Sequence, residues 1–181
     1  MRVRISAHYS DGRVVVRDPE GAGELARRGF GHEEEGGLVL EPWEALYLLE
    51  KGRIKVLDGE TGQELSFQAL LDRLRALDEH IWVKYLVYRD LRERGYVIKR
   101  GFGPGIAFRL YDRGEYGEKA AKYLIYCVLE GVPVSFSSLE EALRAAQGAD
   151  KELILAVVDR RGEVVYYSLS EWARAGRGGE D

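Results

Sequence analysis

Several residue types are scarce in this sequence, and each scarcity excludes a class of site or suggests a source. The 181 residues contain no asparagine, three glutamines, one methionine and one cysteine. The single cysteine, Cys127, cannot form an internal disulfide, and without a Cys/His cluster no structural zinc site is expected. Few amide side chains beside abundant glutamate and arginine are typical of proteins from hot environments, so we expect a thermophilic source.

Long apolar runs are absent as well. No stretch approaches 18 apolar residues, and the first ten residues lack the hydrophobic region of a signal peptide, so we expect a soluble, cytoplasmic protein with no membrane contact. No motif calls for a cofactor. The net charge of −4 argues against a generally basic coat for nucleic acid, although it is compatible with a local basic face.

Hydrophobic alternation and turn signals predict an α/β (α+β) chain in two halves, divided near residues 78–80. In the first half, Asp11-Gly12 between two alternating runs predicts a hairpin. The rest should form a helix over 19–29, a strand–helix–strand unit over 36–58, and a helix that begins after Ser66. The second half should contain these elements in order: a helix over 79–94, two strands around the turn 101–105, a strand near 122–129, a helix capped by Ser137 or Ser138, and a hairpin over 152–169.

Three stretches carry a recognisable pattern. They are "LEPWEALYLLEKGRIKV" (40–56), "VYRDLRERGYVIKRGFGPGIAFRLY" (87–111) and "KELILAVVDRRGEVVYY" (151–167). Together they resemble the archaeal tRNA-splicing endonuclease (tRNA-intron endonuclease) family. The resemblance implies a small N-terminal α/β domain over 1–78 and a C-terminal, restriction-endonuclease-like domain over 79–181. It also implies excision of introns from precursor tRNA at bulge–helix–bulge sites, without metal, leaving a 2′,3′-cyclic phosphate as an RNA lyase does.

The resemblance further implies a catalytic triad of tyrosine as general base, histidine as general acid and lysine as stabiliser of the phosphorane-like charge. Tyr111 fits the tyrosine and Lys151 fits the lysine, but the position of the histidine selects Ala120, and a methyl group transfers no proton. The histidines of this chain all lie earlier, at His8, His32 and His80. Lys119 and Lys122 flank the gap, yet a lysine is a poor acid unless burial lowers its pKa.

A family member without its acid resembles the structural subunit that some archaea pair with a catalytic paralogue. We therefore expect an α2β2 heterotetramer in which the partner supplies the histidine and this chain completes the scaffold around precursor tRNA. The resemblance places RNA contact at Arg144, and the glycine-rich turn adds Lys99 and Arg100 as candidates. Subunit contact is expected at the C-terminal hairpin, through Asp159, Glu163, Val164, Tyr166, Leu169 and Trp172. Each of these residues also has a plain structural interpretation as core, turn or solvated surface.

Three other interpretations were weighed. A metal-dependent nuclease of restriction-enzyme type needs a D/E-x-K motif, and no lysine here has an acid two residues before it. A stand-alone RNA-binding or assembly protein on the same scaffold stays open. So does a catalytically active subunit in which a lysine or water replaces the histidine.

Overall fold

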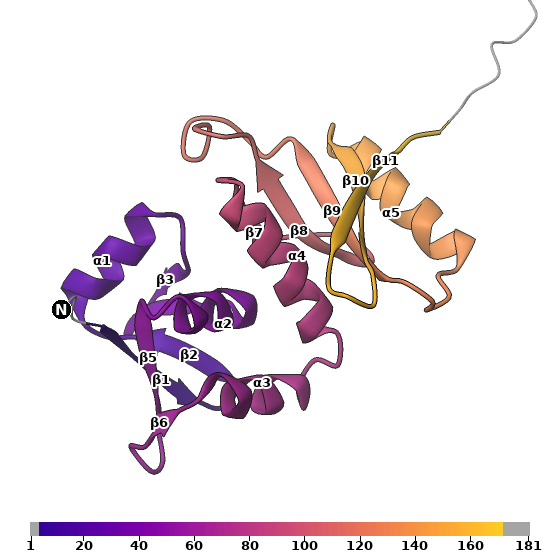
Figure 1. Cartoon of the computed structure of the whole chain (residues 1–181). Coiled ribbons are helices and arrows are strands. Elements are labelled where there is room, and N and C mark those ends of the chain that lie inside the picture. The colour runs from indigo at the N-terminus through magenta and orange to yellow at the C-terminus, as the bar shows by residue number, and fades with distance from the viewer. Residues whose placement is uncertain (1–3, 172–181) are drawn as a thin grey trace, which may run out of the picture.

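The computed structural model describes residues 4–171. Trp172, one of the expected subunit contacts, lies outside the described residues. Within the described range the chain forms two β-sheets and five helices (Figure 1), which confirms the mixed α/β class. The division into domains at 78 and 79 stays a prediction.

The first sheet contains six strands in the order β3-β4-β2-β1-β5-β6, and only β1 and β5 run parallel. Its strands are β1 (Ile5–Ser10), β2 (Arg13–Val16), β3 (His32–Glu34), β4 (Gly37–Leu40), β5 (Ile54–Asp58) and β6 (Glu64–Leu65). The helices of this half are α1 (Pro19–Arg27), α2 (Pro42–Glu50) and α3 (Phe67–Arg75). The short strands β3 and β6 were not predicted, because a two- or three-residue strand carries no alternation to read.

The second sheet contains five strands in the order β11-β10-β9-β8-β7. They are β7 (Val97–Arg100), β8 (Ile106–Tyr111), β9 (Tyr123–Leu129), β10 (Glu152–Val158) and β11 (Val164–Leu169). The parallel pair β9 and β10 is connected through α5 (Phe136–Gly148), while the other neighbours are antiparallel. As a result, the end of β8 and the beginnings of β7, β9 and β10 meet at one end of the sheet.

Helix α4 (Ile81–Glu93) lies between the two halves (Figure 1) and packs on α2 and α3 on one side and on β7, β9, β10 and β11 on the other. Its Tyr88 is fully buried, and the ring lies 6.3 Å from that of Phe108 in β8. Phe108 in turn meets Trp43 of α2 edge to face at 5.0 Å. One continuous apolar core therefore runs through both halves.

Local signals read from the sequence account for most element boundaries. Asp11 and Gly12 both have positive φ, 53° and 78°, which is the backbone that a two-residue hairpin turn requires. The Asp18 carboxylate accepts a hydrogen bond from the Gly21 N–H at 2.7 Å and caps α1, and the Ser66 hydroxyl caps α3.

The predicted cap of α5 was wrong. The helix begins two or three residues earlier than expected, and the Ser135 hydroxyl accepts from the Ser138 N–H at 3.1 Å. Three serines within four residues offered three possible caps. The structure uses the first because Phe136 and Ser137 already have helical backbone.

We expect Phe108→Ala to lower the free energy of unfolding by about 3–5 kcal/mol, because the cavity opens where α2, α4 and β8 meet. The same change at Phe136, which is 82% exposed, is expected to cost about 0.5 kcal/mol or less. Urea unfolding followed by tryptophan fluorescence measures both. Equal midpoints for the two variants would contradict the shared core.

Candidate functional site

The structure brings Tyr111 and Lys151 to the same end of the second sheet. Tyr111 is the last residue of β8, and Lys151 immediately precedes β10. The segment before β9 lies between them, since the Lys122 N–H donates to the Leu110 carbonyl at 3.1 Å and the Glu152 N–H donates to the Lys122 carbonyl at 3.0 Å. Neighbouring strands lie about 4.8 Å apart, so the two side chains begin about two strand spacings apart.

Both side chains are half-buried and already have contacts. The Lys151 ammonium donates to the carbonyl of Ala121, next to the position where the resemblance places the acid. The Tyr111 ring meets the ring of Tyr116 edge to face, with centroids 5.1 Å apart. The lysine is thereby fixed against the backbone of the loop that carries Ala120.

Ala120, where the resemblance places the acid, is exposed, and the lysines on either side of it are Lys119 and Lys122. Lys119 forms an ion pair with Glu115, and this contact raises the lysine pKa. Contact with the Tyr123 side chain and the charge of Asp112 raise the pKa of Lys122. A raised pKa makes each lysine a weaker acid, so neither one meets the condition under which it would replace the histidine.

The three predicted RNA contacts differ in availability. Arg144 projects from α5 and is exposed, with an i,i+4 ion pair to Glu140 at 2.6 Å. The Lys99 ammonium instead donates to the Gly31 carbonyl at 2.7 Å. Arg100 donates two hydrogen bonds to the Glu41 carboxylate, from Nε at 3.1 Å and from Nη2 at 2.6 Å. Lys99 and Arg100 therefore connect β7 to the first half of the chain.

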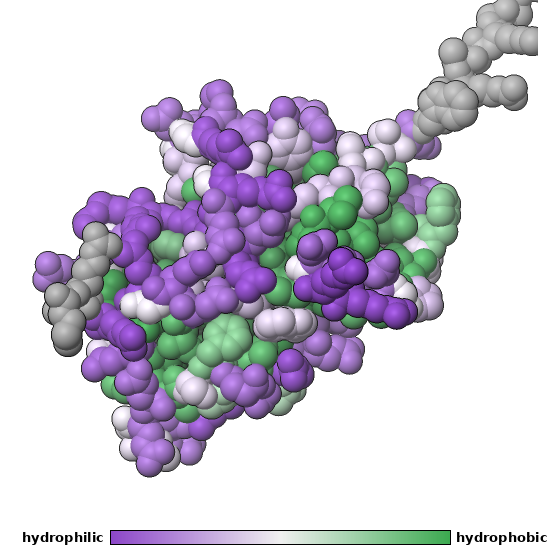
Figure 2. Space-filling view, viewed as in Figure 1, coloured by the Kyte–Doolittle hydropathy of each residue, from purple (hydrophilic) through white to green (hydrophobic). Residues whose placement is uncertain are grey.

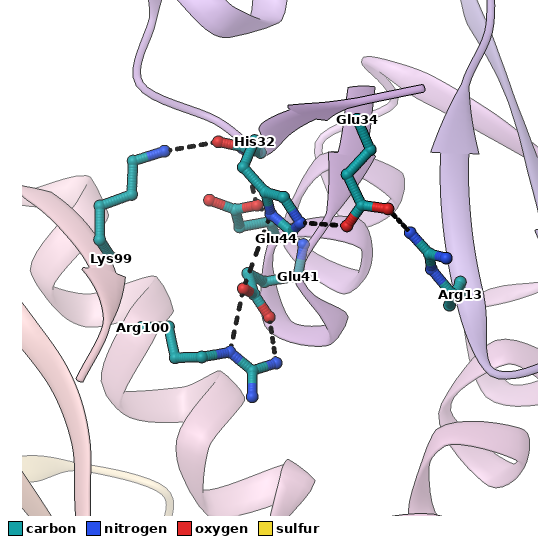
Figure 3. A network of polar contacts seen from close by, with 8 residues as sticks. Arg13, His32, Glu34, Glu41, Glu44, Lys99 and Arg100 are labelled. Carbon is teal, nitrogen blue, oxygen red and sulfur yellow. Dashed lines mark hydrogen bonds and ion pairs between the residues drawn. The ribbon is translucent and has the colours of Figure 1, made fainter. Parts of the chain in front are cut away.

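Figure 3 shows the network in which these two cations take part. Glu41 stands just before α2 and Glu44 lies in its first turn, so both face β7 from the first half. The Glu44 carboxylate accepts hydrogen bonds from the N–H groups of Glu41 and Gly31, each at 2.9 Å. A cleft of about 890 Å³ opens over this network.

Glu44 is the one fully buried carboxylate of the network. Its Oε2 takes both N–H bonds, while Oε1 is buried and has no hydrogen-bond partner among the described residues. Burial raises the pKa of Glu44 to about 7, against the opposing effect of the two N–H groups and the Lys99 charge. Burial likewise lowers the pKa of Lys99. Both shifts favour the neutral forms of the Glu44 and Lys99 side chains.

At the outer edge of the network, the His32 ring lies 2.8 Å from Glu34, which also pairs with Arg13. The hydrogen bonds with His32 and, to a smaller extent, with Arg13 lower the pKa of Glu34. These exposed residues cover the rim of the cleft, and none of them is joined to the sheet end that carries Tyr111.

Sequence reasoning missed Glu41 and Glu44. The available signal was the spacing E-x-x-E around Pro42, at the beginning of the apolar helix "PWEALYLLE". An acid in the third position of a helix commonly turns back to the N–H of the residue before the helix, as Glu44 does. Nothing in that spacing identifies β7 as the partner.

In the C-terminal hairpin, alternate residues of β11 face inward and outward, and this alternation separates the predicted interface residues into two groups. Val164 and Tyr166 face inward, where the Tyr166 hydroxyl donates to Asp90 of α4 at 2.6 Å. Val165 and Tyr167 point outward and are 51% and 55% exposed. Figure 2 shows hydrophobic surface gathered over this hairpin. The outward apolar residues are therefore Val165 and Tyr167, each next in sequence to the predicted Val164 and Tyr166.

The remaining predicted contacts have local roles. The Asp159 carboxylate accepts from the N–H groups of Arg161 at 2.8 Å and Glu163 at 2.9 Å, which orders the turn between β10 and β11. Leu169 is half-buried near α5, and the Glu163 side chain is exposed. Burial raises the pKa of the Cys127 thiol to about 12, so this side chain behaves as an apolar one.

Within residues 4–171 no group of three or more His, Cys, Asp or Glu side chains is arranged to hold a metal ion. None of the helices in that range has the length and apolar character needed to cross a membrane.

Comparison with known proteins gives two domain matches and a set of relatives. Residues 5–71 match the family described as tRNA intron endonuclease, N-terminal domain, and residues 81–166 match its catalytic C-terminal domain. A tRNA-splicing endonuclease of Thermococcus onnurineus is 43% identical over 148 residues, covering 82% of this chain and 84% of the relative. That of Methanococcus vannielii is 38% identical over 165 residues, covering 91% and 93%. That of Pyrococcus furiosus is 39% identical over 175 residues, covering 96% and 99%.

The buried carboxylate predicts a pH dependence of stability. Because the folded-state pKa of about 7 lies above the ordinary 4.5, the folded chain keeps a proton that the unfolded chain releases. The free energy of unfolding should therefore fall as pH rises from about 4.5 to about 7, by up to on the order of 3 kcal/mol.

Glu44→Gln should remove this component, and Glu33→Gln, at an exposed position on β3, should retain it. Chemical unfolding at a series of pH values between 4 and 8 measures both variants against the unmodified chain. An unchanged pH slope in Glu44→Gln would show that the carboxyl titrates normally.

Proposed function

The chain belongs to the tRNA-splicing endonuclease family, and on that basis we propose that it is the structural, non-catalytic subunit of an endonuclease that excises introns from precursor tRNA. It assembles with a histidine-bearing paralogue as an α2β2 heterotetramer. Residues 1–78 and 79–181 form its two domains, and cutting takes place at bulge–helix–bulge sites.

One observation carries the proposal. The segment that matches the catalytic domain, residues 81–166, contains no histidine at all, and Ala120 occupies the position where the family resemblance expects one. RNA cleavage by 2′-hydroxyl attack needs a base at the nucleophile and an acid at the leaving 5′-oxygen. Tyr111 and Lys151 lie at the same end of the sheet, Ala120 has no proton to give, and the neighbouring lysines have raised pKa values. Cleavage then depends on the partner's complete triad.

In the assembly, a chain that lacks the catalytic acid contributes to the spacing of the active sites. To remove an intron, two active sites must be held at a fixed separation, and closed symmetric assembly provides that separation. The outward face of β11 supports such a contact, since an edge strand with apolar residues readily accepts another chain. Val165 and Tyr167 are the residues that would be covered.

Cleavage of a bulge–helix–bulge precursor tRNA, without added metal, tests the proposal directly. We expect the purified chain alone to leave the RNA intact and the mixture with the histidine-bearing paralogue to cut it. Tyr111→Phe in this chain should leave the rate of the mixture unchanged within about twofold, whereas the equivalent change in the partner should lower it by about 10² or more.

Two results would replace this proposal with the alternatives. Cleavage by the chain alone that is lost in Tyr111→Phe would identify an active subunit with a substitute proton donor. RNA binding by a chain that stays monomeric and never joins the paralogue would identify a stand-alone RNA-binding or assembly protein.

The β11 surface makes a separate prediction. Val165→Arg should lower the affinity for the partner at least about tenfold or abolish the association. The reason is that a charged side chain loses its water in an apolar interface. Val132→Arg is a matched control, since Val132 is 52% exposed and Val165 is 51% exposed. Light scattering on a sizing column reports the assembly, and equal assembly of both variants would place the interface elsewhere.

A further inference from the structure

A second cleft, of about 710 Å³, lies where the ends of α1 and α2 meet the turn from α4 to β7. We call it the basic cleft. Its lining consists of Arg28, Phe30, Tyr47, Leu48, Lys51, Arg53, Arg92, Gly95, Tyr96 and Val97. Four of these ten residues are cationic, three are aromatic and none is acidic, in a chain of net charge −4. The lining of this cleft therefore carries a net positive charge.

The charge at the floor of the basic cleft is not cancelled. The Arg92 guanidinium donates to two neutral carbonyls, those of Tyr96 at 3.1 Å and of Arg28, and it lies 4.2 Å above the ring of Phe30. Within the described residues, no ion pair involves Arg92 or Arg53. The arginine is thus held rigidly while it keeps its full charge.

The rim cations are only partly neutralised. Lys51 pairs with Glu93 at 2.5 Å, and Arg28 lies 3.9 Å from Glu24. Both of these pairs are solvent-exposed, and exposed ion pairs break at little cost when a stronger anion is available.

The basic cleft opens at the sheet end that carries Tyr111. Val97 of the cleft is the direct cross-strand partner of Tyr111, and the Arg113 guanidinium lies 4.9 Å from the ring centroid of Tyr96. The sheet end therefore presents Lys151, Lys122 and Arg113 in successive positions, followed by the cleft. Three strand spacings, about 14 Å, separate β10 from β7.

We propose that the basic cleft binds the sugar–phosphate backbone of precursor tRNA outside the bulge–helix–bulge, along a path that continues from the sheet end. This inference rests on the proposed function. Guanidinium groups match phosphate oxygens in pairs of hydrogen bonds, and the rings of Phe30 and Tyr96 hold the guanidinium groups of Arg92 and Arg113 at the cleft. The lining itself contains no acid, and the two carboxylates at the rim, Glu24 and Glu93, are paired with Arg28 and Lys51, which limits the repulsion that a phosphate meets.

Arg53→Gln tests the cleft, because among the described residues this side chain forms no ion pair and no side-chain hydrogen bond that the change would break. Arg75→Gln on α3 is the control, an exposed arginine that does not line the cleft. Affinity for full-length precursor tRNA and for a minimal bulge–helix–bulge RNA is measured over a series of KCl concentrations. It is measured with the chain alone and with the paralogue present.

Arg53→Gln should weaken binding of the full-length precursor by about 3- to 10-fold and reduce the salt slope by about 1. Binding of the minimal RNA, and every value for Arg75→Gln, should stay unchanged. Unchanged affinity and slope for the precursor would overturn the inference, as would an equal loss on the minimal RNA.

Two further outcomes separate this inference from the proposed function. If Arg53→Gln instead weakens association with the paralogue and leaves RNA affinity intact, the cleft receives an acidic protein segment and the inference fails. If the chain binds precursor tRNA through Arg53 but the mixture never cuts it, the basic cleft stands and the structural-subunit proposal falls. A wild-type chain that binds no precursor in either setting would overturn the cleft.

Discussion

The structure depends on the position of α4, whose aromatic face is buried between helices α2 and α3 on one side and the second sheet on the other. Tyr88 contacts the ring of Phe108 in β8, and Phe108 contacts Trp43 in α2, so three elements distant in sequence share one apolar contact. The second sheet buries its inner face against this helix, while α2 covers the first sheet and packs its other side on α4, because an amphipathic sheet or helix needs a covering layer. The orientation of the two halves follows from that packing.

Beside this apolar contact, polar side chains of α2 and β7 form the contact between the two halves. A buried carboxylate costs free energy unless it is hydrogen-bonded, and Glu44 satisfies only one of its two oxygens. The neighbouring pair of Glu41 and Arg100 has bidentate geometry, which specifies one mutual arrangement of α2 and β7. The cations of β7 thus serve the contact between the halves, and a different set of cations, in the basic cleft, carries uncancelled charge toward solvent.

The absence of an acid at Ala120 has no structural cost. Ala120 is exposed in a loop, and the strands on either side of it are held by backbone hydrogen bonds that are independent of the side chain. A catalytic group can be lost at such a site while the scaffold persists. On the proposed function, the same sheet would still serve assembly through β11 and RNA contact through the basic cleft.

The sequence alone determined the local features of this protein, including the Asp11-Gly12 hairpin, the cap at Ser66, the order of the elements and the absence of histidine from residues 81–166. Those features depend on residues close in the chain, whose preferences act without the rest of the fold. Only the tertiary structure decided that Lys99 and Arg100 bind the first half, that Val165 rather than Val164 faces outward, and that Glu44 is buried. Register and the packing of distant segments set these outcomes, and a shift of one residue in a strand exchanges its two faces.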